Sequence, residues 1–208
     1  MKISQIDLSR ISFHGFSLSK NWIGYFQWIG FDDETKKSEY NQELIHKAGL
    51  LLYEYFKDCW NDFFVLSGLR YDDEAENETG ADELYGNVYN KAKEIGLLIP
   101  VDDEYEKWSD YKWFKLPKTQ IPLHFLRFCF DKDFILPYSE MAMAMVFGKI
   151  CGQKCFLINP KLQIALYPHD DIGYGCIDLG DNPKILTDFL NYCDKNQDFI
   201  SHIEEQYR

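Results

Sequence analysis

Apolar runs and turn residues alternate most densely between Lys154 and Leu179, so this stretch is the predicted centre of the fold. The three apolar runs are Cys155–Ile158, Leu162–Tyr167 and Cys176–Leu179. Asn159-Pro160 separates the first two runs, and a cluster of Pro, Asp and Gly at 168–175 separates the last two. Short apolar runs bounded by such residues are typical of strands joined by turns. The pattern predicts an antiparallel β-meander.

Three other stretches place apolar residues three and four positions apart, which is the spacing of one helix face, and a fourth is predicted to be helical from its length and composition. The predicted helices span residues 38–60, 82–95, 138–151 and 183–206. The first helix rests on an apolar stripe made of Tyr40, Leu44, Ala48, Leu51, Leu52, Tyr55 and Cys59. In the second helix, acidic residues at the start and lysines near the end match the helix dipole.

The other two helices are predicted from weaker signals. Within 138–151, Met141, Met143 and Met145 alternate as in a strand, but the length of the stretch and its Ala and Met content favour a helix. Asn182-Pro183 is a good start for the last helix, which residues 195–198 could interrupt.

The strongest single strand prediction is Trp22–Phe31, which repeats Trp-Ile-Gly six residues apart. An even spacing puts Trp22 and Trp28 on one face of a strand, and because the alternate positions are apolar too, the strand should be central. We favour a core role for these rings; the alternative is an aromatic platform for a sugar or a base. Shorter strands are predicted at 11–16, 63–69 and 124–130, which gives a strand, helix, strand unit over residues 22–70.

The composition narrows the class of protein. The 208 residues are 46% hydrophobic and 17% aromatic, enough for one real core, and the net charge is −12. This charge argues against binding to nucleic acid or to an anionic membrane, because such binding needs clustered Lys and Arg. No apolar run approaches the length of a bilayer span, and six cysteines within mostly apolar runs indicate free thiols in a reducing cytoplasm.

Most of the negative charge lies in residues 71–106, which carry 12 acidic side chains and two lysines, a net charge of −10. The part at 71–83 has almost nothing to bury and is predicted to be a solvated loop. The part at 102–114 interleaves rings with charges; its rings either lie back on the core or form a binding patch, as Trp and Tyr do at interfaces. The predicted partner-binding residues are Asp72, Asp73, Glu74, Glu76, Glu78, Asp102, Asp103, Glu104, Tyr105, Trp108, Tyr111 and Trp113.

Residues that could carry catalysis gather in the turn after the second run of the meander. Two carboxylates and an imidazole, at His169, Asp170 and Asp171, with Asp178 nearby, could bind a divalent metal or share acid and base roles. The competing interpretation, which we favour, is that these are ordinary turn residues. Cys151 and Cys155 lack the second pair that a structural zinc site requires. Phosphate-loop, dinucleotide-binding and serine-hydrolase motifs are absent from the sequence.

The chain resembles a set of small uncharacterised bacterial proteins that end in a meander with a Tyr-Asp-Asp-Arg-Gly-apolar-Asp signature and a closing helix. The residues that carry the resemblance are Tyr167-Pro168-His169-Asp170-Asp171-Ile172-Gly173 and then Asp178. Here Pro168 and His169 separate the tyrosine from the aspartates, and Ile172 stands in place of the arginine. In size, acidity and aromatic content the chain is similar to immunity proteins that neutralise secreted bacterial nuclease toxins.

Together these patterns predict a single α+β domain over residues 1–208, with a mainly antiparallel mixed sheet, a C-terminal β-meander and about four packed helices. We expect a cytoplasmic binding protein, most concretely an immunity or inhibitor protein that occludes a basic, nuclease-type bacterial toxin. No catalytic residue, metal or cofactor is expected in that role. The alternatives are a metal-dependent hydrolase that uses His169, Asp170 and Asp171, and a bacterial housekeeping domain.

Overall fold

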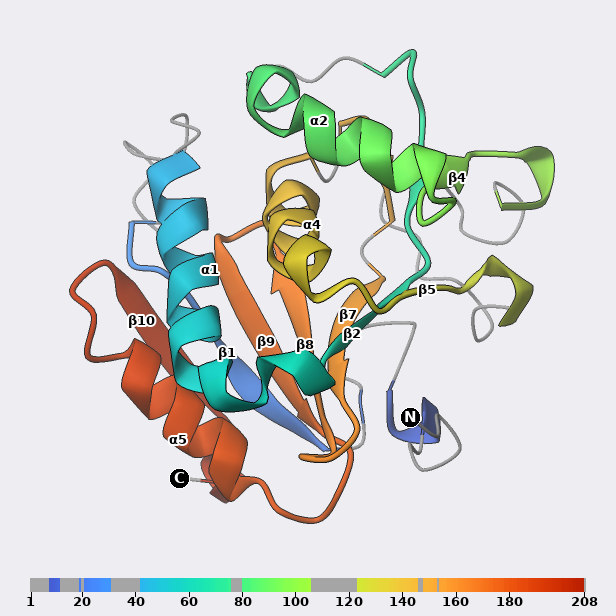
Figure 1. Ribbon diagram of the computed structural model, residues 1–208. Coiled ribbons are helices and arrows are strands. Elements are labelled where there is room, and N and C mark those ends of the chain that lie inside the picture. Colours follow the sequence, from blue (N-terminus) through green and yellow to red (C-terminus); the bar gives the residue numbers. More distant parts are fainter. Residues whose placement is uncertain are drawn as a thin grey trace.

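The computed structural model describes residues 8–11, 19, 21–30, 42–75, 80–105, 123–145, 148–152 and 154–207. These residues form an α+β fold around a seven-stranded antiparallel sheet with the strand order β10-β1-β9-β8-β7-β2-β5 (Figure 1). The strands of this sheet are β1 (Trp22–Trp28), β2 (Phe64–Ser67), β5 (Arg127–Cys129), β7 (Cys155–Asn159), β8 (Ile164–His169), β9 (Gly173–Asp178) and β10 (Phe199–Ile203). The predicted fold class is confirmed.

A second sheet of three short strands has the order β4-β3-β6. Its strands are β3 (Arg70–Tyr71), β4 (Ile99–Pro100) and β6 (Ile150–Cys151). The α-helices whose two ends both lie within the described ranges are α1 (Gln42–Phe56), α2 (Ala81–Glu94), α4 (Lys132–Met145) and α5 (Lys184–Cys193). Short 3-10 helices span Leu8–Arg10, Lys57–Asp62, Leu123–Phe125 and Glu205–Tyr207.

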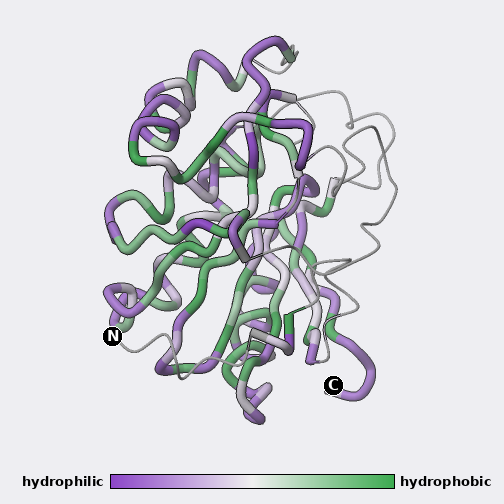
Figure 2. Tube along the Cα trace, turned by 90° about the vertical axis from the view of Figure 1, so that its right-hand side faces the viewer, coloured by the Kyte–Doolittle hydropathy of each residue, from purple (hydrophilic) through white to green (hydrophobic). Residues whose placement is uncertain are grey.

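Helices α1, α4 and α5 cover one face of the large sheet, here called the helix face, and α2 packs against α4 (Figure 1). The larger core cluster lies on this face and includes Phe26, Phe56, Leu166 and Phe189. On the opposite face, here called the second face, a smaller cluster includes Phe64, Leu66, Phe156, Tyr167, Tyr105 and Phe125. Hydrophobic positions follow the central strands, whereas the outer segments are mostly hydrophilic (Figure 2). Both faces of the sheet are therefore buried, as the continuous apolar runs indicated.

The C-terminal meander forms as predicted, with β7, β8 and β9 paired in sequence order. Tyr167 lies directly opposite Gly175, where a β-carbon would come within 1.9 Å of the tyrosine ring. The glycine thus leaves room for the ring to lie across the neighbouring strand.

The third predicted helix, 138–151, begins and ends earlier than its pattern indicated. Helix α4 spans Lys132–Met145, and Ile150–Cys151 form strand β6. The side chain of Asp131 accepts a hydrogen bond from the amide of Asp133 at 3.1 Å, which satisfies a free amide at the helix start. Pro137 lies inside this helix, where a proline is disfavoured, so the sequence pattern favours a start after it.

The last predicted helix, 183–206, is wrong in its second half. Helix α5 ends at Cys193, and β10 follows as an edge strand paired with β1. The interruption weighed at 195–198 is therefore the end of the helix. The amide of Ser201 donates a hydrogen bond to the side chain of Asp194, and the hydroxyl of Ser201 donates one to the carbonyl of Leu190. These two bonds hold the strand against the helix. Tertiary pairing with β1 overrides the helical spacing of the apolar residues.

The two tryptophans of the first strand do not share a face, which corrects the sequence-based assignment. A bulge between Trp22 and Gly24 shifts the alternation, so Trp22 packs on the second face and Trp28 on the helix face. Gly24 has φ +147°, and a β-carbon there would lie 2.0 Å from the carbonyl oxygen of His202. A bulge adds one residue to a strand and so reverses every later side chain.

The unit predicted over residues 22–70 is present as β1, α1 and β2, and the run at 63–69 contains β2. The run at 124–130 splits into a 3-10 helix and β5. Of the strand predicted at 11–16, only Ile11 lies within the described residues.

Candidate functional site

Strands β3 and β4 bring the two acidic segments to one end of the small sheet. The strands are parallel, with Tyr71 paired to Pro100, and the amide of Val101 donates to the carbonyl of Tyr71 at 3.0 Å. Asp72–Glu74 and Asp102–Glu104 therefore both follow the carboxyl ends of neighbouring strands. We call these six residues the acidic edge. The predicted residues Glu76, Glu78, Trp108, Tyr111 and Trp113 lie outside the described residues.

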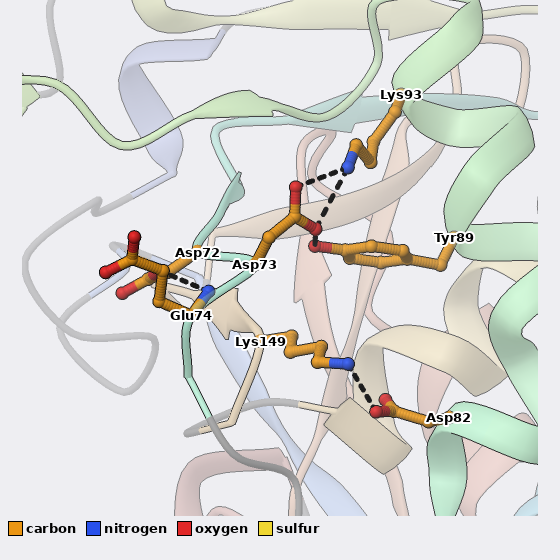
Figure 3. A network of polar contacts seen from close by, with 7 residues as sticks. All are labelled: Asp72, Asp73, Glu74, Asp82, Tyr89, Lys93 and Lys149. Atoms are coloured by element: carbon orange, nitrogen blue, oxygen red, sulfur yellow. Dashed lines mark hydrogen bonds and ion pairs between the residues drawn. The ribbon is translucent and has the colours of Figure 1, made fainter.

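Asp73 is used within the fold. Its carboxylate accepts hydrogen bonds from the hydroxyl of Tyr89 at 2.9 Å and from Nζ of Lys93 at 2.7 Å (Figure 3). The bond from Lys93 holds the pKa of Asp73 below its ordinary value. Lys149, beside β6, makes a second link to α2 through Asp82. These contacts fasten α2 to the small sheet.

The remaining acidic side chains of the edge divide into two groups. Asp72 accepts a bond from the amide of Glu74 at 2.9 Å, Asp102 accepts one from the amide of Tyr105 at 2.7 Å, and Glu104 lies 3.1 Å from His124. The carboxylates of Glu74 and Asp103 are exposed and make no hydrogen bond or ion pair within the described ranges. Glu74 and Asp103 are therefore the acidic side chains most available to a partner.

Tyr105 does not lie on the surface, where the sequence placed it as a partner contact. It is 2% exposed and packs on the second face, with its hydroxyl 3.4 Å from the carbonyl oxygen of Cys151. Gly152 makes room for it, since a β-carbon there would lie 2.4 Å from the hydroxyl oxygen. Of the alternatives left open for this aromatic segment, Tyr105 follows the one in which rings lie back on the core.

His169 is held at the end of β8 in a state that disfavours its charged form. Its Nε2 lies 3.1 Å from the carbonyl oxygen of Phe26, and since a carbonyl only accepts, Nε2 carries the proton. Burial lowers the pKa of His169 to about 4. Nδ1 is buried and has no hydrogen-bond partner in the described ranges, and the nearest carboxylate oxygen, on Asp171, is 3.8 Å away.

Burial raises the pKa of two further carboxylates of the meander, those of Asp170 and Asp178. Asp178 is buried and accepts a bond from the amide of Gly180 at 3.1 Å, which is ordinary turn chemistry. Within the residues that the structure describes, no group of three His, Cys, Asp or Glu side chains could hold a metal ion.

An aromatic cluster surrounds His169 on the second face. The ring of Tyr25 contacts those of His169 and His202 at centroid distances of 5.7 and 4.8 Å. Trp22 stacks on Tyr25, and its Nε1 donates to the hydroxyl of Tyr167 at 2.8 Å. The bulge in β1 builds this cluster, because it turns Trp22 toward Tyr167.

Arg70 is the residue that sequence reasoning missed. It is fully buried at the start of the small sheet, and its guanidinium packs against the rings of Tyr105 and Phe125, which also contact each other. The signal in the sequence was a single arginine directly after the apolar run Phe63–Leu69. A charge in that position has to be buried or has to end the strand.

A comparison with protein families identifies the chain. The model of the family "Domain of unknown function (DUF3885)" matches residues 16–179. The chain belongs to this family. The match contains the acidic edge, Arg70 and His169, and it ends with the last strand of the meander. No curated protein and no solved structure matches the chain.

Two further predictions concern the cysteines and the membrane. All six cysteines are free, and all except Cys59 are buried, which confirms the expected thiols. Among the described residues, no helix is long and apolar enough to cross a membrane.

Proposed function

We propose that this protein is a cytoplasmic binding protein whose acidic edge occludes a basic partner protein, most concretely a nuclease-type bacterial toxin. The observation that carries the proposal is the parallel pairing of β3 and β4, which collects two acidic segments 30 residues apart at one end of the small sheet. The net charge of −12 also favours a positively charged partner.

The chemistry of a nuclease explains why an acidic surface would inhibit it. A nuclease binds phosphates through clustered Lys and Arg side chains, so its substrate-binding surface is positively charged. An acidic protein is attracted to that surface, and complementary charge raises the association rate more than it raises the final affinity. The protein would then act by covering the substrate-binding surface of the toxin.

The structure selects the side chains for the test. Glu74→Lys combined with Asp103→Lys reverses two exposed charges that support no described contact, so the fold should be unaffected. Glu205→Lys is the control, because Glu205 is exposed and lies three residues before the C-terminus, which is far from β4 in Figure 1. The probe is a partner captured from the native cell by the purified chain, or the product of the neighbouring open reading frame.

The double variant should lower the association rate at least tenfold at low salt, whereas Glu205→Lys should change it little. The wild-type rate should fall steeply with ionic strength, because the Debye length shrinks from about 10 Å at 0.1 M to about 3 Å at 1 M salt. The dissociation rate should change much less. Co-expression of the partner should harm cells, and the wild-type chain should prevent this harm. An association rate that ignores both salt and the double variant would contradict the proposal.

A further inference from the structure

The guanidinium of Arg70 has one nitrogen, Nη1, that makes hydrogen bonds, and an edge formed by Nε and Nη2 that makes none within the described ranges; this edge is called the unused edge. Its Nη1 donates to the backbone carbonyl oxygens of Phe125 at 3.1 Å and Leu69 at 3.3 Å. The rings of Tyr105 and Phe125 lie 5.0 and 4.9 Å from the guanidinium carbon. Nε and Nη2 are buried, and in the described part of the chain neither has a hydrogen-bond partner. The guanidinium is thus positioned by its backbone contacts and by two rings, while two of its nitrogens stay unused.

The two unused nitrogens are the pair that binds oxyanions. Nε–H and one N–H of Nη2 lie parallel along the same side of the planar guanidinium. This edge matches the two oxygens of a carboxylate or a phosphate and forms two parallel hydrogen bonds with them. A backbone carbonyl supplies a single oxygen and cannot serve both donors with the same geometry.

An anion would stabilise the buried positive charge of Arg70 more than a neutral hydrogen-bond acceptor would. Arginine keeps its proton in proteins, so burial cannot neutralise it as it would a lysine. Burial lowers the pKa of Arg70, and the positive charge of Arg127 lowers it further, whereas Tyr105 and the carboxylate of Asp102 act to raise it. Among the described residues, the only hydrogen-bond acceptors that Arg70 reaches are two backbone carbonyls, so no carboxylate forms an ion pair with it. A buried guanidinium without a paired anion is strongly unfavourable.

We propose that the unused edge of Arg70 is a binding site for a small-molecule oxyanion, with a carboxylate or a phosphate group held by Nε and Nη2. The rings of Tyr105 and Phe125 pack against the guanidinium and hold it in place for the bound group. Asp102 of the acidic edge lies near this site, but the inference does not depend on the proposed function.

The first test uses the unmodified protein. The probes are inorganic phosphate and acetate, each titrated against sodium chloride of equal ionic strength, and the readout is the Nε–H resonance of Arg70 in NMR spectra of the nitrogen-labelled chain. We expect a saturable shift of this resonance with one probe or both, and a rise of the melting temperature that follows the same saturation curve. A response to phosphate alone identifies a phosphate site, and a response to acetate identifies a carboxylate site.

The second test separates the geometry of the guanidinium from its charge. Arg70→Lys keeps the positive charge but loses the two-donor edge, so we expect probe affinity to fall at least tenfold. Arg10→Lys is the matched control, because Arg10 bonds Gly180 and Asp181 at another part of the chain. If Arg70→Lys does not fold, the titration of the unmodified protein decides. An Arg70 resonance that shows no saturable response to either probe overturns the proposal.

Discussion

The two faces of the large sheet treat buried polar groups differently. On the helix face, buried hydroxyls form matched pairs: Ser67 with Tyr138 at 2.8 Å and Ser139 with Tyr174 at 2.7 Å. On the second face, Nδ1 of His169 and two nitrogens of Arg70 are buried without a hydrogen-bond partner in the described ranges. The remaining buried atom without a partner in the described ranges is Oδ1 of Asp82, on α2, and the other oxygen of that carboxylate pairs with Lys149. The second face therefore carries most of the buried groups that still have bonding capacity.

This difference shows where to look for function. A buried polar group without a partner costs free energy, so it persists only where something else requires it. The second face also carries the aromatic cluster around His169, and the small sheet beside it leads to the acidic edge. We infer that the helix face holds the fold together and that the second face and the small sheet hold the binding chemistry.

The largest expected effect tests the structural role of the helix face. Phe189 is fully buried, and its ring packs on Phe26, Tyr55 and Phe56 at centroid distances of 5.1 to 5.7 Å. Phe189→Ala should lower the free energy of unfolding by about 3 to 5 kcal/mol, measured by urea denaturation. Phe128→Ala is the control on the other side of the sheet, where the ring is 43% exposed; its loss should stay below about 1 kcal/mol. Equal losses would remove the distinction between the faces.

The second prediction concerns acid and the second face. The pKa of His169 is lowered to about 4 from 6.5 by burial, so folding favours the neutral ring. The contribution of the neutral ring to the free energy of unfolding is fully present above pH 6.5. It is lost as the pH drops from 6.5 to 4, by about 3 kcal/mol in total. His169→Gln keeps a donor for the carbonyl of Phe26 but does not titrate, so it should flatten this loss in urea denaturation series. A wild-type His169 ring that titrates near pH 6.5 by NMR would contradict the prediction.

A smaller effect is expected from the hydroxyl pairs of the helix face. Ser67→Ala leaves the hydroxyl of Tyr138 buried without its partner, at a cost of about 1 to 3 kcal/mol. Tyr138→Phe on top of Ser67→Ala should recover part of this loss, because it removes the unsatisfied group. The double-mutant cycle, measured by chemical denaturation, should therefore show a coupling energy. Additive losses would mean that the pair contributes nothing as a pair.

The sequence predicts most of the fold where local patterns and tertiary structure agree. The meander and the first two helices follow from apolar spacing and turn residues, because each element buries the residues that its period aligns. The closing helix fails because β10 is an edge strand whose pairing with β1 is not visible in its own residues. The prediction that Trp22 and Trp28 share a face is wrong because a bulge next to Gly24 shifts the alternation of side chains along β1.

The candidate sites could be predicted less well than the fold. The composition located the acidic segments, but only the parallel pairing of β3 and β4 shows that they meet. From the sequence, Asp73 and Glu74 were equally good candidates for contact with a partner. The structure distinguishes them, because Asp73 is bonded to Tyr89 and Lys93. Arg70 could not be assigned, because its burial depends on rings that lie far along the chain at Phe125 and at Tyr105.

The smallest expected effect has the opposite pH dependence and lies on the helix face. Glu140 of α4 is buried beside Gly49 of α1, and its Oε1 lies 3.1 Å from Nδ1 of His46. Burial raises the pKa of Glu140 above its ordinary value of 4.5, although the bond with His46 opposes this. The folded state therefore favours the protonated acid, and stability is lost as the pH rises from 4.5 through the raised pKa.

Glu140→Gln removes this loss and keeps the polar contact with His46. The variant should be more stable than the wild type at neutral pH, and the difference should disappear as the pH falls toward 4.5, in thermal unfolding followed by circular dichroism. Glu94→Gln on the exposed side of α2 is the matched control and should leave stability unchanged. If Glu140→Gln were instead less stable at neutral pH, the ion pair with His46 would stabilise the fold by more than the burial of the carboxylate costs. An ion pair would then link α1 to α4 on the helix face.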